Sequence, residues 1–316
     1  MIISASRRTD IPAFYGDWLV NRLRAGEVLV RNPMNTKQIT RILLSPSTVD
    51  CLVFWTKNPQ EFIKHLPEID EMGYKYYFLF TLNPYNSALE AGIEKKVRLI
   101  ETFKRLSDVI GPHRVIWRYD PIVLTDVFNK EYHFKSFKYL ADSLSSYSDK
   151  CIISFVDIYK KIEKRLRQID YILPDDTLID EIAFFFSKVC SHYKFDLYTC
   201  SQSFDFSKYG IGHSKCIDDE LVRLVTGKNL EFSKDSSQRD ECGCIESRDI
   251  GAYNTCTHQC LYCYANDNYD KAFQKHSHFD PHSRLLCDSL NGDERIVDYR
   301  PKAHRIKPGS PQGNLF

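Results

Sequence analysis

The chain has 316 residues, of which 43% are hydrophobic and 27% charged, and its formal net charge is +1. This length allows a large apolar core in one or two domains, and the composition is ordinary for a globular protein. A net charge so close to zero excludes a strong overall attraction to nucleic acid or to anionic membranes, and leaves room only for a local basic patch. No apolar run could cross a bilayer, and no signal-peptide pattern is present, so we expect a cytoplasmic protein with no membrane partner.

The first 200 residues alternate short apolar runs with amphipathic segments. Runs rich in β-branched and aromatic residues predict strands at Met1–Ala5, Val49–Trp55, Lys75–Thr81, Arg114–Arg118, Cys151–Val156 and Phe195–Thr199. Apolar spacings of three and four predict helices at Tyr15–Ala25, Pro59–Met72, Glu90–Ile110, Lys130–Ser145, Tyr159–Ile169 and Asp176–His192. This alternation predicts an α/β fold with a mostly parallel sheet, either open or closed as a barrel.

Polar residues follow the predicted strands. The carboxyl edge of a parallel sheet is where α/β folds build their sites, so these residues are candidates for a shared rim. The candidate catalytic residues are Arg7, Arg8, Asp10, Arg118 and Asp120. Asp, Asn and Pro also act as turn and cap residues, and that alternative stays open for each position taken singly.

The last third of the chain departs from this alternation. Residues 203–248 are polar and irregular apart from a predicted helix at Asp218–Thr226, and Asp249–Tyr253 is a further candidate strand. Residues 291–316 are polar and proline-containing, and we expect a flexible tail there. The predicted organisation is therefore one main domain over residues 1–290, followed by this tail.

Three cysteines stand close together in the loop 254–266. Cys256, Cys260 and Cys263 follow the spacing C-x3-C-x2-C, with Tyr262 just before the last cysteine. Thiolates hold iron–sulfur clusters, and a four-iron cluster normally takes four of them. Three ligands would leave one iron open to a small chelating molecule. The alternatives are a structural zinc site that adds His258, or a set of buried free thiols.

This loop closely resembles that of the radical S-adenosylmethionine (radical SAM) enzymes. The resemblance implies a 4Fe–4S cluster on Cys256, Cys260 and Cys263 whose open iron binds S-adenosylmethionine. One electron from the cluster then cleaves the bound molecule to a 5′-deoxyadenosyl radical, while the protein orients and shields the reaction. In that superfamily an aromatic residue beside the adenine occupies the position of Tyr262.

Further segments resemble an uncharacterised bacterial family with a radical-SAM-like cysteine cluster near its C-terminus. They are Ser6-Arg-Arg-Thr-Asp-Ile-Pro12, Trp55-Thr-Lys-Asn-Pro59, Arg118-Tyr-Asp-Pro-Ile122 and several stretches between Cys242 and Ala265. Similarity to spore photoproduct lyase and its relatives is weaker. The resemblance implies a partial, TIM-like barrel of parallel strands of the radical SAM type. That barrel would be circularly permuted, so that the iron–sulfur loop lies near the C-terminus and its strand pairs beside Met1–Ala5.

The permuted barrel would bring the cysteine loop to the rim of the predicted sheet. Thr56, Lys57 and Asn58 are then the candidates for holding the polar groups of S-adenosylmethionine. The alternative for Lys57 is a solvated lysine at the start of a helix.

Four other cysteines form a second candidate metal site. Cys242 and Cys244 make a C-x-C pair, Cys200 ends a predicted strand, and Cys216 lies in the irregular segment. Together they could hold an auxiliary iron–sulfur cluster or a zinc ion, which would help to order this polar stretch. The alternative is a group of unpaired cysteines that serve as small buried residues.

The leading functional prediction is a radical SAM enzyme whose substrate the sequence does not identify, with a nucleic acid or a nucleotide as the favoured class. Such an enzyme needs a flavodoxin or ferredoxin as electron donor. The chain ends in Gln312-Gly-Asn-Leu-Phe316, which resembles the peptide that binds the bacterial sliding clamp. The alternative function is a non-enzymatic iron–sulfur or zinc-binding redox sensor or interaction protein.

Overall fold

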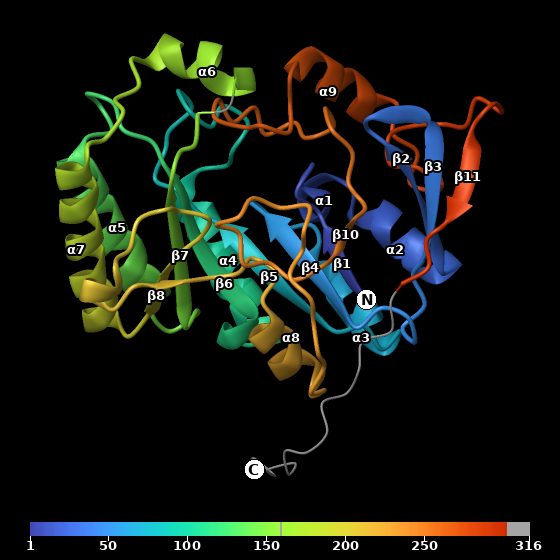
Figure 1. The fold of residues 1–316 in the computed structure, drawn as a ribbon, viewed down its shortest axis with the longest axis horizontal. Coiled ribbons are helices and arrows are strands. Elements are labelled where there is room, and N and C mark those ends of the chain that lie inside the picture. Colours follow the sequence, from blue (N-terminus) through green and yellow to red (C-terminus); the bar gives the residue numbers. More distant parts are fainter. Residues whose placement is uncertain (159, 302–316) are drawn as a thin grey trace.

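A computed structural model describes residues 1–158 and 160–301. At its centre lies an eight-stranded sheet in which every neighbouring pair of strands is parallel (Figure 1). In spatial order the strands are β10 (Arg248–Asp249), β1 (Ile2–Ala5), β4 (Cys51–Thr56), β5 (Tyr76–Thr81), β6 (Val115–Ile122), β7 (Lys150–Phe155), β8 (Asp196–Thr199) and β9 (Gly212–His213). The end strands β10 and β9 each pair on one side only, so the sheet is open within the described residues and is compatible with a partial barrel.

Helices fill most of the crossovers between these strands. They are α1 (Ile11–Phe14), α2 (Gly16–Ala25), α3 (Leu66–Glu71), α4 (Lys96–Ile110), α5 (Lys130–Leu144), α6 (Lys160–Leu166), α7 (Asp176–Tyr193), α8 (Asp219–Thr226) and α9 (Tyr269–Ser277). Short 3-10 turns lie at Ile63–His65, Pro112–Arg114, Arg167–Ile169 and Ser207–Tyr209. Within residues 1–158 and 160–301, no helix is long and apolar enough to cross a membrane.

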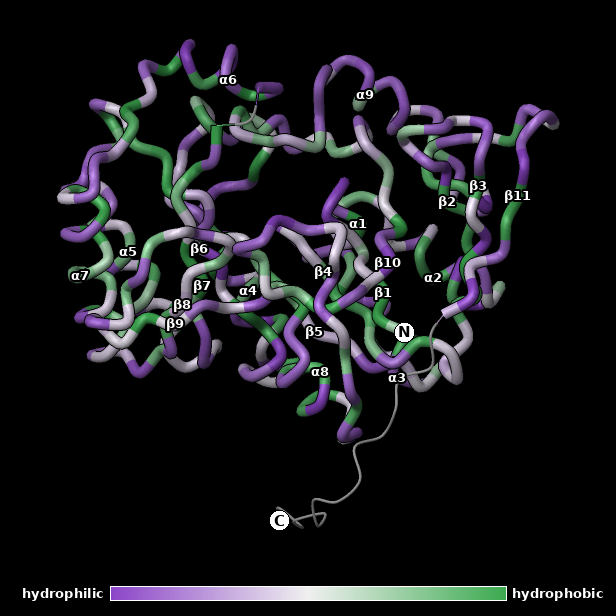
Figure 2. Tube along the Cα trace, in the orientation of Figure 1, coloured by the Kyte–Doolittle hydropathy of each residue, from purple (hydrophilic) through white to green (hydrophobic). Residues whose placement is uncertain are grey.

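Both faces of the main sheet are buried. Phe54 and Phe80 belong to a large core that includes residues of α4, α5 and α7, whereas Val53 and Leu79 face a second core together with residues of α8. Alternate residues of a strand point to opposite faces, so strands buried on both sides are apolar throughout. Hydrophilic residues gather instead on outer elements such as α6 and α9 (Figure 2).

The predicted α/β fold with a parallel sheet is confirmed. Each of the six strands expected in the first 200 residues is present, with ends shifted by a few residues. The further strand expected at Asp249–Tyr253 is shorter and forms β10, which pairs with β1 through Ile3 opposite Arg248 and Ser4 opposite Asp249.

The sequence analysis did not predict a second, three-stranded sheet. It consists of β2 (Glu27–Asn32), β3 (Asn35–Leu43) and β11 (Arg295–Asp298), in the order β11-β3-β2, and lies at the right of Figure 1. Its strands are rich in polar residues, which weakens the pattern from which strands are predicted.

The prediction of a flexible tail from residue 291 is therefore wrong for part of that segment. Strand β11 pairs in parallel with β3, and Arg41 Nε lies 2.7 Å from Asp298 Oδ1. Backbone pairing and this ion pair order a stretch whose composition alone indicates disorder. The clamp-like residues Gln312–Phe316 and the predicted helix start Tyr159 lie outside the described residues.

Strand β10 is joined to β1 by side-chain contacts as well as by backbone pairing. Asp249 Oδ2 accepts hydrogen bonds from Ser4 Oγ at 2.8 Å and from the Arg7 backbone N–H at 2.7 Å. Gly251 then passes so close to Ser6 that an added Cβ would lie 2.6 Å from Ser6 Cβ. The cysteine loop that follows β10 is thereby held at the carboxyl end of β1.

Replacement of Gly251 by alanine should lower the free energy of unfolding by about 2 kcal/mol, because a methyl group has no space beside Ser6. Urea unfolding followed by circular dichroism measures this loss. Gly212→Ala is the matched control, since its Cβ would meet only ring atoms of Tyr198 at 3.2 Å. An equal or larger loss in the control would contradict the assigned contact.

Candidate functional site

A cavity of about 1130 Å³ lies at the carboxyl edge of the main sheet. Its lining contains nearly every residue that the sequence analysis singled out: Arg7, Arg8, Asp10, Thr56, Lys57, Arg118, Asp120, Cys200, Cys216, Cys242, Cys244, Cys256, Cys260, Tyr262 and Cys263. Asn58 does not line the cavity. Its Oδ1 accepts a hydrogen bond from the Gln60 backbone N–H at 3.2 Å, so the side chain caps the following turn.

The cysteine loop rests on the segment that precedes α4. Leu261 N donates to Leu89 O and Gly92 N donates to His258 O, both at 2.9 Å. A Cβ at residue 92 would lie 2.7 Å from the backbone oxygen of Thr257, so only glycine allows this approach. These contacts fix the loop with Cys256 and Cys260 buried and Cys263 half-buried.

The loop thiols can bind a metal only if they give up their protons. Burial raises the pKa of both Cys256 and Cys260. Thiols in such surroundings stay protonated unless a cation replaces the proton, and metal ligation does this because the bound form is the thiolate. The residues therefore fit a thiolate-bound metal, provided that the metal supplies the positive charge.

The zinc alternative receives no support from the geometry. Across residues 1–158 and 160–301, no group of three or more His, Cys, Asp or Glu side chains is placed to hold a single metal ion. His258 Nε2 instead lies 2.8 Å from Asp10 Oδ2. An iron–sulfur cluster differs from zinc because its thiolates bind separate irons and need not surround one point.

Asp10 joins three segments at the rim of the cavity. Besides its contact with His258, its Oδ2 accepts the Lys57 backbone N–H at 2.7 Å, and its Oδ1 accepts the Ala13 N–H at 3.0 Å. It therefore links the end of β1, the end of β4 and the cysteine loop. In this structure Asp10 is a positioning residue rather than a free carboxylate.

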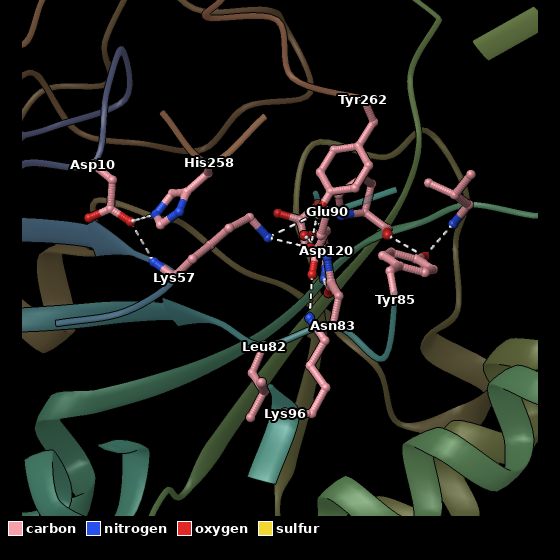
Figure 3. A network of polar contacts seen from close by, with 12 residues as sticks. Asp10, Lys57, Leu82, Asn83, Tyr85, Glu90, Lys96, Asp120, His258 and Tyr262 are labelled. Atoms are coloured by element: carbon pink, nitrogen blue, oxygen red, sulfur yellow. Dashed lines mark hydrogen bonds and ion pairs between the residues drawn. The ribbon is translucent and has the colours of Figure 1, made fainter. Parts of the chain in front are cut away.

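Glu90 is the centre of a buried polar network (Figure 3). Its Oε1 contacts Lys57 Nζ at 2.8 Å and accepts a hydrogen bond from Tyr262 Oη, while its Oε2 contacts Lys96 Nζ. Tyr262 Oη also accepts hydrogen bonds from Lys57 Nζ at 2.9 Å and from Asn83 Nδ2 at 3.1 Å. The aromatic residue before Cys263 is thus held by the ends of β4 and β5.

Glu90 was not among the predicted site residues. The apolar spacing indicated a helix from Glu90, but α4 begins at Lys96 and Glu90 lies before it, only 2% exposed. The ammonium group of Lys57 contacts Glu90 and Tyr262 in this network. Lys57 is therefore not a solvated lysine at the start of a helix. Nothing in the sequence near Glu90 indicates that Lys57 will reach it, because their contact arises from the sheet.

The charges in this network stabilise one another. Burial by itself would raise the pKa of Glu90, but the ammonium groups of Lys57 and Lys96 outweigh it and lower that pKa to about 2. Burial tends to lower the pKa of Lys57, yet Glu90 raises it above its ordinary value. Glu90 therefore stays ionised and raises the pKa of Lys57. At Lys96 burial outweighs Glu90, so the pKa of that lysine lies below its ordinary value.

Arg118 and Asp120 form a second buried group on β6. Arg118 Nη2 pairs with Asp120 Oδ2, and Asp120 Oδ1 accepts a hydrogen bond from Ser154 Oγ. Arg118 Nη1 also donates to Cys216 Sγ at 2.9 Å. The predicted rim residues of β6 therefore contact the second cysteine group.

The cavity as a whole carries more positive than negative side chains. Among its described lining residues, six arginines and three lysines face five aspartates and no glutamate. Trp55 and Tyr253 add aromatic surface, and the guanidinium groups of Arg7 and Arg8 stack over these two rings at 5.5 and 5.3 Å. Part of this excess is balanced by carboxylates outside the lining, since Arg31 pairs with Glu294, Lys57 with Glu90 and Arg248 with Glu246.

Residues 2–265 match the family described as "Domain of unknown function (DUF1848)". The chain belongs to this family. The matched region of the DUF1848 chain begins at β1 and ends just after the cysteine loop, so it contains both the sheet and the three loop cysteines. No curated protein and no solved structure matches the chain.

Replacement of Glu90 by glutamine should lower the free energy of unfolding by about 3 kcal/mol at pH 7, because two buried ammonium groups lose their counter-charge. The pKa of Glu90 lies below that of the unfolded chain, so its contribution is complete above about pH 4.3 and is lost as the pH falls toward 2. The difference between wild type and variant should therefore shrink at acid pH.

Urea unfolding at pH 7 and at acid pH measures both effects. Glu94→Gln is the control, since Glu94 makes an exposed pair with Arg98 at 3.3 Å, and such pairs contribute about 0.5 kcal/mol. Equal losses for the two variants, or a pH-independent difference for Glu90→Gln, would contradict the network described here.

Proposed function

We propose that this protein is a radical SAM enzyme that holds a 4Fe–4S cluster on Cys256, Cys260 and Cys263. The observation that supports this most directly is the placement of three cysteines from one short loop along the wall of a large cavity. That loop offers three thiolates, and an iron without a protein ligand is what a chelating cofactor requires. When bound, the cluster supplies one electron and an open iron for S-adenosylmethionine.

The residues of the chain would bind and enclose the cofactor. Tyr262 is held by Lys57, Glu90 and Asn83, so its ring stays beside the cysteines. Thr56 and Lys57 line the cavity close to it and remain our candidates for contacts to the cofactor. Burial of the loop would limit access of water to a reactive intermediate.

The substrate that fits this lining best is a phosphate-bearing molecule with an aromatic base, such as a nucleotide or a nucleic acid. The arginines and lysines of the lining suit phosphate groups, and Trp55 and Tyr253 offer aromatic surface for a base. A redox sensor needs no lined cavity of this size, which favours the enzyme over the non-enzymatic alternative.

The decisive assay is cleavage of S-adenosylmethionine by protein purified without oxygen and reconstituted with iron and sulfide. After reduction with dithionite, or with flavodoxin or ferredoxin as the natural type of donor, 5′-deoxyadenosine should accumulate. Cys256→Ala should abolish this product because one cluster ligand is lost. The control Cys51→Ala should retain it, since Cys51 is buried on β4 and does not line the cavity.

Three results would contradict the proposal. Zinc in place of iron would favour a structural site. A cluster that forms without binding S-adenosylmethionine would favour the sensor. Equal product from wild type and Cys256→Ala would show that the loop does not carry the reaction.

A further inference from the structure

A second group of four cysteines lies on the same cavity as the loop. Cys200 follows β8, Cys216 follows β9, and Cys242 and Cys244 precede β10. All four are at least nine-tenths buried and all four line the cavity. Three separate segments of the chain thus place thiols on the wall of one cavity.

The four sulfur atoms form one contiguous group. Cys200 Sγ lies 3.1 Å from Cys216 Sγ. Cys216 is in side-chain hydrogen-bond contact with Cys244, and Cys244 is in similar contact with Cys242. The sulfurs therefore form one chain of contacts in the order Cys200, Cys216, Cys244 and Cys242.

Two arginines, the buried Arg118 and the half-buried Arg7, lie against this group. Arg118 is 8% exposed and donates from Nη1 to Cys216 Sγ at 2.9 Å. Arg7 interacts electrostatically with Cys216 and Cys244. Asp120 and Asp235 pair with these arginines, yet Arg118 Nε and Arg7 Nη2 remain buried without a hydrogen-bond acceptor among the described residues.

Unpaired buried N–H groups are costly, so their presence beside four thiols points to a missing negative partner. Four neutral thiols are weak acceptors and carry no charge. A metal centre bound by four thiolates carries net negative charge and offers several sulfur acceptors. The two guanidinium groups would then be neutralised in place.

The spacing of the sulfurs also bears on the kind of cluster. Within the described parts of the chain, no group of three or more His, Cys, Asp or Glu side chains is placed around a single metal ion. A two-iron cluster holds two thiolates on each iron and so brings sulfurs close together in pairs, whereas the thiolates of a four-iron cluster bind separate irons.

We propose that Cys200, Cys216, Cys242 and Cys244 hold a second iron–sulfur cluster, distinct from the centre proposed on the cysteine loop. With four protein ligands this cluster has no iron left open for a substrate. It accepts one electron from an external reductant and passes one electron on, with no bond made or broken. Its place on the wall of the shared cavity suits delivery of electrons to the loop cluster.

The second cluster also accounts for the order of an irregular segment. The backbone oxygen of Cys216 accepts a hydrogen bond from Tyr77 Oη at 2.8 Å, and that of Cys244 accepts the Asp235 N–H at 2.9 Å. Cluster binding at the adjoining thiols would tie this polar stretch to β5 and to the end of β8. The proposal stands independently of the function proposed above, since it concerns different cysteines.

The test is a metal count in a variant that lacks the loop ligands. The triple variant Cys256→Ala/Cys260→Ala/Cys263→Ala is reconstituted with iron and sulfide without oxygen, and its iron, sulfide and zinc are measured. It should keep about two or about four irons with matching sulfide, which also tells the two cluster types apart. Reduction by dithionite should give an electron paramagnetic resonance signal. Folding is verified by circular dichroism.

Absence of iron from the folded triple variant, or one zinc ion in place of iron, would overturn the proposal. The iron content of the triple variant tests the second cluster alone, because this variant lacks the loop ligands and cannot cleave S-adenosylmethionine whether or not the second cluster forms. Failure of the function proposed for the loop would therefore leave the expected iron content unchanged.

The reciprocal variant Cys216→Ala/Cys244→Ala removes the two central ligands of this group. It should lose the amount of iron that the triple variant keeps. Cys51→Ala is the matched control, since Cys51 is buried in the same apolar cluster as the four cysteines and should lose no iron. Should the double variant not fold, Cys242→Ser replaces it. Unchanged iron in a folded reciprocal variant would overturn the ligand assignment.

Discussion

The parallel pairing of β10 with β1 is the constraint on which the rest of this structure depends. Only four residues form it, Ile3 and Ser4 opposite Arg248 and Asp249. Yet it brings a segment from near residue 250 to the strand that begins the chain. The cysteine loop follows β10 directly, so the pairing decides at which edge of the sheet the thiols lie.

Buried charges then hold the loop in place. Glu90 contacts Lys57 and Lys96 and also fixes Tyr262, while Asp10 connects His258 with the backbone of Lys57. Apart from the contact of Glu90 with Lys96, each of these contacts joins segments that are distant in sequence. Charges taken out of water are stable only with partners in good geometry, so the networks favour one arrangement of the loop over others.

Positive charge and sulfur are the two dominant features of the cavity. Seven of the 11 cysteines line it, and the arginines there exceed what its aspartates balance. The two proposals divide these features between them. In the first proposal the three loop cysteines would hold a cofactor, and the arginines and lysines would receive an anionic substrate. In the second, the four other cysteines and two arginines would form an electron-transfer centre.

The strands of the main sheet could be predicted because they are short, apolar and buried on both faces, a pattern that needs no tertiary information. The cysteine spacing and the polar strand ends were equally visible. The hairpin of β2 and β3, the strand β11 and the role of Glu90 could not be predicted. The residues of β2 and β3 are largely polar, and Glu90 lies in a helix-like pattern. Strand β11 and Glu90 also gain their positions from partners far along the chain.

The sequence by itself therefore determined the parallel α/β class and the residue types available for chemistry, because both follow from local patterns. Only the tertiary structure decided that the two cysteine groups share one cavity, that Arg118 contacts Cys216, and that Glu90 is buried between two lysines. These facts depend on the order of strands in the sheet, and strand order is set by long-range packing rather than by neighbours in the sequence.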